Sequence, residues 1–266
     1  MSSYATSAEG QRLLTEGSLE LEGRLLTASN ATFVGAVTLG DASSACVYKP
    51  IRGERPLWDF PDGTLAYRER AAYLVSAATG TPLVPPTVLR DGPFGPGMCQ
   101  LWIDDDTEQE MVDVVAEGGV PDGWLHILDA EDQHRHAVSL VHRDDPGLQQ
   151  MAVLDVMINN ADRKGGHVLV DKQGRLFGVD HGVSFHSNDK LRTVLWGWAG
   201  TRLPDPCVAA LRGVQKALDD DLAAELAGLL SVQEVRALVG RVERLLRTMR
   251  FPSPSAQWPA IPWPAF

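Results

Sequence analysis

The sequence predicts an α+β protein whose chain divides into a β-rich first part and a mainly helical second part. Apolar and polar residues alternate through residues 18–49, which is typical of strands. Apolar residues at helical spacing dominate residues 206–249 and predict two or three amphipathic helices. At 266 residues and 28.9 kDa, the chain is long enough for one large domain or two small lobes.

The first part, residues 1–103, is expected to be a β-rich N-lobe with one helix. Residues 18–25, 33–39 and 45–49 predict three strands, and Gly40-Asp41 joins the last two into a meander. Apolar residues sharing one face of residues 65–78 predict a helix, and Gly80 and Pro82 predict its end. Two more strands are expected at residues 84–89 and 97–103.

The second part, residues 104–250, is expected to be a mainly helical C-lobe in which strands are rare. A helix is predicted over residues 148–159, and a polar loop follows it at residues 160–167. Residues 168–170 and 176–179 then predict a hairpin around the turn Lys172-Gln173-Gly174. The proline-rich tail, residues 251–266, carries Trp258 and Trp263 and cannot be helical. It either packs on the body or binds a partner.

The charge balance argues against two classes of partner. Lys and Arg number 24 against 35 Asp and Glu, so the net charge of -11 repels the phosphates of nucleic acids and of anionic lipids. We therefore expect neither nucleic-acid binding nor stable membrane association. No stretch approaches the roughly 18 apolar residues of a membrane span, and the start lacks a signal-peptide pattern. Cysteines 46, 99 and 207 are too widely spaced for a disulfide framework or zinc ribbon. A soluble, cytoplasmic protein is expected.

Residues 155–182 carry the densest group of chemically active side chains. Asp162, His167 and Asp180 fall at the mouths of consecutive short strands, with the glycine pair at 165 and 166 between them. Glycines let the backbone approach a ligand closely, and carboxylates with an imidazole can hold a divalent metal against phosphates. Phosphoryl transfer needs one carboxylate to position the attacking hydroxyl and others to hold metal, and this spacing supplies both.

These residues carry a family resemblance. The run Asp162-Arg-Lys-Gly-Gly-His167 resembles the DRHxxN catalytic loop of phosphatidylinositol 3- and 4-kinases. Asn160-Ala-Asp-Arg163 is similar to the NxDR form of type II phosphatidylinositol 4-kinases and HipA-like kinases, and Asp180-His-Gly182 stands where those families have a DFG-type aspartate. The whole chain resembles an actinobacterial family of phosphatidylinositol 3/4-kinase-like proteins. The resemblance implies a two-lobed protein-kinase-like/PI3-4-kinase-like fold and an ATP- and divalent-metal-dependent phosphotransferase.

The resemblance also implies roles for the loop residues. Asp162 would position the acceptor. Lys164, in place of the family's histidine, would either contact the γ-phosphate or be an ordinary loop lysine. His167 and Asp180 would hold Mg²⁺ or Mn²⁺. Because His167 replaces an asparagine and imidazole suits softer ions, we expect a preference for Mn²⁺. Metal-dependent nucleotide binding should then weaken as pH falls towards about 6.5, the ordinary histidine pKa.

Upstream residues fit the same scheme. Lys49 is one of only five lysines and ends an apolar strand, and Glu69 lies in the following helix. The resemblance implies that Lys49 binds phosphate and that Glu69 orients it. Taken singly, Lys49 could be a strand-end lysine and Glu69 a solvated helix charge. The first two strands enclose no glycine run, so Ser29, Asn30 and Thr32 would replace part of the usual phosphate-binding backbone.

The adenine-binding segment is expected where the last N-lobe strand ends. The resemblance places Gln100, Trp102 and Ile103 there, with Trp102 either stacking on the base or lying in the core.

The acceptor and the activity are less sharply defined by the sequence. Residues 184–192 hold only two formal cations, which favours a protein or small-molecule acceptor over a phosphoinositide. One alternative is a nucleotide-binding pseudokinase that regulates a partner without turnover. Another is a metal hydrolase using His167, Asp180, His181 and His186 without nucleotide, although the HExxH spacing is absent.

Overall fold

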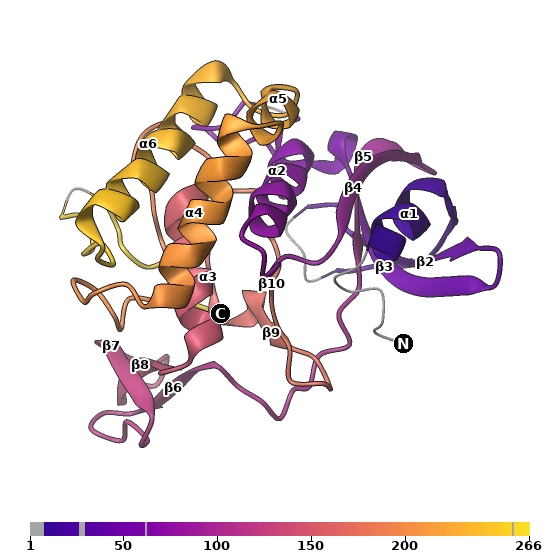
Figure 1. Ribbon diagram of the computed structural model, residues 1–266. Helices are drawn as coiled ribbons and strands as arrows, with labels where there is room; N and C mark the ends of the chain where they lie inside the picture. The colour runs from indigo at the N-terminus through magenta and orange to yellow at the C-terminus, as the bar shows by residue number, and fades with distance from the viewer. Residues whose placement is uncertain (1–7, 27–29, 62, 257) are drawn as a thin grey trace.

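The computed structural model describes residues 8–26, 30–61, 63–256 and 258–266. Within these ranges the chain is a mixed α+β fold, in which a five-stranded sheet adjoins a group of helices (Figure 1). The predicted α+β class is confirmed. No helix in the described ranges is both long enough and apolar enough to cross a bilayer.

The five-stranded antiparallel sheet contains the predicted meander. Its order is β1-β2-β3-β5-β4. The strands are β1 (Ser18–Arg24), β2 (Phe33–Leu39), β3 (Ala42–Pro50), β4 (Thr87–Gly92) and β5 (Gly95–Leu101). Gly40, with φ of 60°, makes the β2–β3 turn in a conformation that glycine adopts without strain. The fourth strand begins at Thr87 rather than at residue 84, because Pro85 and Pro86 cannot donate to a ladder.

Two helices flank this sheet. Helix α1 (Ala8–Glu16), which the sequence reading did not anticipate, buries Leu13 and Leu14 against the sheet residues Val37, Cys46 and Cys99. Helix α2 (Leu65–Ala78) has the predicted bounds. Its buried alanines and valine join the larger core of the helical part rather than the smaller sheet core. Helix α2 also contacts strands β4 and β5 of the sheet. The lobe boundary expected between residues 103 and 104 stays a prediction.

The helical part contains α3 and the three C-terminal helices. Helix α3 (Pro146–Ile158) begins after the N-cap Asp145 and ends at Asn159, which has a left-handed conformation. The other helices are α4 (Asp205–Asp219), α5 (Leu222–Ala227) and α6 (Val232–Thr248). Strands β9 (Val168–Val170) and β10 (Leu176–Gly178) form the predicted hairpin. A short 3-10 helix at Gly165–His167 precedes β9.

The prediction that strands are rare after residue 104 is wrong. Strands β6 (Val112–Ala116), β7 (Trp124–Glu131) and β8 (Ala137–Arg143) form an antiparallel sheet of order β6-β8-β7. β7 has no fully buried residue, and its register shifts between His126 and Leu128. An exposed strand with an irregular register lacks the clean alternation that identifies a strand, so this segment resembles an acidic surface region.

The proline-rich tail lies along the body, as the packing alternative expects. The carbonyl of Ala260 accepts hydrogen bonds from the backbone N–H of Thr193 (3.0 Å) and from the indole Nε1 of Trp196 (2.9 Å). Further along, the carbonyl of Ala265 accepts from the N–H of Gly165 at 2.8 Å. Figure 1 accordingly shows the C-terminus close to α3 and β9. The tail therefore reaches the loop that follows α3.

Candidate functional site

A cavity of about 440 Å³ lies where the end of β3, the end of β5 and the loops around β9 and β10 meet. Its size falls within the range of small-molecule sites. Among the residues that line it are most of those expected to form the site: Asn30, Lys49, Gln100, Trp102, Ile103, Asp162, Lys164, His167 and Asp180. Glu69 does not line the cavity but contacts Lys49. Ser29 lies outside the described residues.

Lys49 bridges two carboxylates. Its Nζ lies 2.7 Å from Oε1 of Glu69 and 2.8 Å from Oδ1 of Asp180. Burial disfavours the charge on Lys49, but Asp180 and Glu69 outweigh it and raise the pKa of the amine. The lysine charge in turn lowers the pKa of Asp180 far below its usual range. Burial raises the pKa of Glu69, against the pull of Lys49.

Asp180 is held in an uncommon backbone conformation. It follows β10 with φ of 60°, in the left-handed region that few non-glycine residues occupy. The next residue secures this turn, because the N–H of His181 donates to Oε2 of Glu69 at 2.9 Å. About half of the Asp180 side chain is exposed, and it lines the cavity. Glu69 of α2 thus orients both Lys49 and the loop that carries Asp180.

His167 faces Asp180, with 3.5 Å between Nε2 and Oδ2. Burial lowers the pKa of His167 to about 4, so the ring is neutral at neutral pH. Its Nδ1 accepts a long hydrogen bond, 3.5 Å, from the N–H of Lys164, which leaves the proton on Nε2. A metal at Nε2 would therefore require this proton to move to Nδ1. Without a metal, burial therefore moves the titration of His167 from the ordinary histidine range near 6.5 to about 4.

The donor set fits a metal that arrives with phosphates. Within the described ranges, no three His, Cys, Asp or Glu side chains are grouped so as to hold a metal alone. Mg²⁺ is usually bound by one or two carboxylates together with substrate phosphates, and imidazole suits softer divalent ions than Mg²⁺. Asp180 and His167 supply one ligand of each kind, so they could complete such a site with a nucleotide present.

Asp162 and Lys164 form the other charged wall of the cavity. Nζ of Lys164 lies 3.5 Å from Oδ2 of Asp162. Burial raises the pKa of Asp162, although the Lys164 charge opposes the rise. The backbone N–H of Asp162 donates to Oδ1 of Asn160 at 3.0 Å, which shapes the loop. A carboxylate with a raised pKa is a better proton acceptor than an ordinary one.

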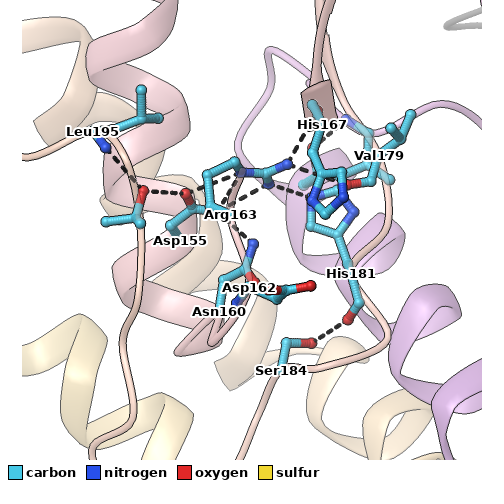
Figure 2. A network of polar contacts seen from close by, with 12 residues as sticks. Asp155, Asn160, Asp162, Arg163, His167, Val179, His181, Ser184 and Leu195 are labelled. Carbon is cyan, nitrogen blue, oxygen red and sulfur yellow. Dashed lines mark hydrogen bonds and ion pairs between the residues drawn. The ribbon is translucent and has the colours of Figure 1, made fainter. Parts of the chain in front are cut away.

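A buried ion pair between Arg163 and Asp155 connects the loop that carries Asp162 with the loop that carries Asp180 (Figure 2). Nη2 of Arg163 lies 2.9 Å from Oδ1 of Asp155, and both side chains are fully buried. Nη1 of Arg163 donates to the carbonyls of His167 (3.2 Å) and Val179 (3.1 Å). Asn160 adds an amide hydrogen bond to Asp155 at 2.9 Å. This network, which sequence reasoning did not identify, fixes the Asp162 loop relative to the Asp180 loop.

His181 belongs to this network rather than to a metal cluster. Nη2 of Arg163 contacts Nε2 of His181 at 2.6 Å, and burial lowers the pKa of His181 well below its usual value. Nε2 is therefore the acceptor, and the ring is neutral. His186 packs elsewhere, edge-on to Phe60 with ring centroids 5.4 Å apart. Of the four residues expected for a metal hydrolase, His167 and Asp180 lie together, but His181 is engaged by Arg163 and His186 packs elsewhere. Among the described residues these four therefore do not form one metal-binding group.

The lining of the cavity also includes apolar side chains. These are Leu25, Val47, Leu169 and Val179, together with Trp102, whose side chain is half-exposed. Trp102 is therefore not a core residue. Its backbone N–H donates to the carbonyl of Ala45 at 3.0 Å.

Two of the expected polar contacts are engaged within the protein. Nε2 of Gln100 donates to Oγ1 of Thr87 at 2.8 Å. Oδ1 of Asn30 accepts from the N–H of Arg55 at 2.8 Å. Both side chains therefore help to shape the walls of the cavity.

Phe266 is a cavity residue that the sequence reading missed. It lines the cavity beside Lys164 and Gly166. Its ring lies over Gly165, where a Cβ atom would stand only 2.3 Å from Cε1 of the phenylalanine. The glycine pair at 165 and 166 was the available signal, because a missing side chain leaves room for another group. The sequence does not indicate that the group comes from the tail.

No family model matches the chain, but it has similarity to a solved structure and to a sequence relative. The crystal structure of a Helicobacter pylori proinflammatory kinase, CtkA, aligns with 90% of this chain and 94% of its own, with a TM-score of 0.45 and 12% sequence identity. Protein Rv2133c of Mycobacterium tuberculosis is 49% identical over 263 residues, which cover 96% of this chain and 94% of the relative. The chain therefore belongs to the same protein family as Protein Rv2133c.

Proposed function

We propose that the protein is an ATP- and divalent-metal-dependent phosphotransferase with a two-lobed, kinase-like arrangement. The observation that carries this proposal is a single cavity lined by two unlike kinds of side chain. Lys49, Asp162, His167 and Asp180 line it together with apolar side chains and Trp102. A nucleotide combines the same two kinds of surface, since its base is planar and weakly polar and its phosphates are anionic.

The proposed roles follow from these positions. The base lies against Trp102 and the apolar side chains, and the phosphates extend towards Lys49 and Lys164. Glu69 keeps Lys49 in place through the 2.7 Å ion pair. A divalent metal held by Asp180 and His167 would neutralise charge on the phosphate oxygens. When phosphate approaches, Lys49 exchanges part of its contact with Asp180 for phosphate oxygens.

The transfer step assigns the proton to Asp162. The acceptor hydroxyl oxygen bonds to the γ-phosphorus while the bond from that phosphorus to the leaving ADP oxygen breaks. Asp162 takes the hydroxyl proton, and its raised pKa suits that role. Lys164, whose Nζ lies 3.5 Å from Oδ2 of Asp162, is proposed to contact the moving phosphoryl group.

The acceptor is proposed to be a protein or small molecule rather than a lipid headgroup. The two cations of residues 184–192 are engaged within the protein. Lys190 is paired with Asp59 and lies over the rings of Trp58 and Trp258. Arg192 stacks on the same Trp258 ring. Neither is therefore arranged as a basic patch for an inositol phosphate.

The first test is nucleotide-dependent stability. ATP at about 100 times its Kd, with Mn²⁺ or Mg²⁺, should raise the free energy of unfolding by roughly 2.7 kcal/mol, which a thermal-shift assay detects. Lys49→Met should remove most of this stabilisation. Lys216→Met, the same change at an exposed lysine of α4, should leave it intact. An unchanged ATP response in Lys49→Met would refute the assignment of the cavity as the nucleotide site.

Transfer is tested separately. Radiolabelled γ-phosphate should appear on an acceptor or as autophosphorylation when the wild-type protein is incubated with ATP and metal. Binding without any transfer would favour the nucleotide-binding regulator over the enzyme.

A further inference from the structure

Arg68 is a buried arginine of α2 that does not line the nucleotide cavity. It precedes Glu69 on the helix, and only 1% of the residue is exposed. Its guanidinium donates through Nη1 to the carbonyl of Ser184 and through Nη2 to Oε1 of Glu234, both at 2.6 Å. Cζ of Arg68 also lies 4.7 Å from the centre of the Phe60 ring. The arginine therefore connects α2 with two segments that are distant in sequence.

Arg68 and Glu69 together hold the short segment that follows Asp180. At the start of this segment, Oε2 of Glu69 accepts from the N–H of His181 at 2.9 Å. Three residues later, the carbonyl of Ser184 accepts from Arg68. Between these two points, Oγ of Ser184 donates to the carbonyl of His181 at 2.6 Å and closes the segment into a turn. Because adjacent residues of α2 bind both ends of this turn, the helix cannot rotate about its axis without breaking one of the two contacts.

Glu234 gives Arg68 an anchor on a third element, the first turn of α6. Oε2 of Glu234 accepts from the N–H and from Oγ of Ser231, at 2.9 and 2.8 Å, and Oε1 is left for the arginine. Burial favours the neutral acid, but the hydrogen bonds from Ser231 and Arg68 outweigh it and lower the pKa of Glu234. Leu238 and Val242 fix the same helix in the main core. The carboxylate is therefore charged and held in place.

We propose that Arg68 is a positioning residue of the nucleotide site. It fixes α2 and the segment after Asp180, and thereby keeps Glu69 against Lys49. This inference rests on the proposed function. Asp180 shows why such support is needed, since its left-handed backbone, with φ of 60°, is costly for a residue other than glycine and persists only where its surroundings hold it. The planar guanidinium suits the task because it presents its N–H donors in fixed directions.

The first arm of the test measures ATP affinity by calorimetry in the presence of Mn²⁺ or Mg²⁺. Arg68→Met should bind ATP about tenfold more weakly, the usual effect of losing one hydrogen bond to a charged group. Glu234→Gln keeps an acceptor for Ser231 but removes the charge that holds Arg68, so it should weaken ATP binding too and serves if Arg68→Met does not fold. Glu243→Gln, the same change at an exposed residue of α6, should bind ATP as the wild type does. Val242→Ala destabilises the core without touching the arginine and should also keep the wild-type affinity.

The second arm needs no nucleotide and separates positioning from stability. Amide hydrogen exchange, measured by NMR, follows the N–H of His181, which Glu69 accepts, and the N–H of the buried Leu154 in α3. A loss of global stability accelerates both amides alike, whereas a local release accelerates only the first. In Arg68→Met, exchange at His181 should therefore accelerate by about tenfold more than exchange at Leu154. In Val242→Ala the two amides should accelerate by the same factor.

The two arms also separate this inference from the proposed function. If the wild type binds no ATP, the proposed function fails, and hydrogen exchange alone decides whether Arg68 positions Glu69. The inference is overturned if, in both Arg68→Met and Glu234→Gln, exchange at His181 accelerates no more than exchange at Leu154. It is overturned equally if the wild type binds ATP and both variants bind it with the same affinity.

Discussion

At the scale of single residues, the environment of His167 decides its charge. The ring is buried beside Asp180 and stays neutral, because burial lowers its pKa to about 4. In the unfolded chain a histidine has a pKa of about 6.5. As pH falls below about 6.5, the unfolded state therefore gains a proton that the folded state does not. Stability contributed by the neutral ring is complete above pH 6.5 and is lost as pH falls towards 4.

We predict that the wild type loses about 3 kcal/mol of stability relative to His167→Asn between about pH 7.5 and pH 4. Urea unfolding at several pH values measures the difference between the two proteins, in which contributions from other histidines cancel. His134→Asn, at an exposed ring, is the control and should show a much smaller change. A wild-type-to-His167→Asn difference that does not change with pH would show that the ring is not desolvated.

Asp162 supplies a second prediction at this scale. Asp162→Asn should bind ATP with wild-type affinity, since Asp180 and His167 rather than Asp162 are proposed to hold the metal. Phosphoryl transfer should fall by roughly 10²–10⁴-fold, the usual effect of losing a general base. Single-turnover transfer assays beside ATP calorimetry separate the two effects. Full transfer activity in Asp162→Asn would show that another group takes the hydroxyl proton.

At the scale of elements, the contact between the tail and the loop after α3 is short and specific. A Cβ at residue 165 would meet the Phe266 ring at 2.3 Å, whereas one at residue 166 would meet nothing within 4 Å. Gly165→Ala should therefore push the half-exposed ring aside, and its cost should shrink in a Phe266→Ala background. Unfolding free energies of the four proteins should give a coupling of about 0.5–3 kcal/mol. Gly166→Ala, the control, should show no coupling to Phe266→Ala, and additive effects at residues 165 and 266 would contradict the contact.

The start of α3 gives a prediction about helix capping. Oδ1 of Asp145 accepts from the N–H groups of Gly147 (2.8 Å) and Leu148 (3.0 Å). Asp145→Ala removes this acceptor and should lower the free energy of unfolding by about 1 kcal/mol. Asp145→Asn keeps an acceptor and should cost much less. Chemical denaturation measures both, and equal losses would show that the cap contributes nothing through its hydrogen bonds.

At the scale of the whole molecule, net charge is the dominant property. With a net charge of -11, we predict that the protein does not bind duplex DNA or phosphatidylserine vesicles at physiological salt. Fluorescence anisotropy and vesicle co-sedimentation measure the two interactions. Lowering the salt should not induce binding, because weaker screening strengthens the repulsion. Salt-sensitive binding to either surface would reveal a basic patch strong enough to overcome the overall charge.

The same scale shows which features the sequence can indicate. The meander and α2 were predictable because their periodic patterns and their turn residues agree locally. β7 was not, since it lies largely exposed and its register slips between His126 and Leu128. The ordered motif indicated Asp162 and Asp180, and the structure places both on one cavity. The lowered pKa of His167 and the contact of Phe266 depend on burial and on chain segments far apart in sequence, which local patterns do not encode.

The placement of the five lysines has a practical consequence for chemical labelling. Amine-reactive reagents modify the neutral amine, so Lys49, with its raised pKa, and Lys190, only 7% exposed, should react slowly. Lys172, 63% exposed, and the exposed Lys216 should react readily. Lys164 lies at the cavity wall between these extremes. With so few competing amines, peptide mass spectrometry can follow acylation at Lys49 and Lys164 individually, and protection at these two sites would report directly on what occupies the cavity.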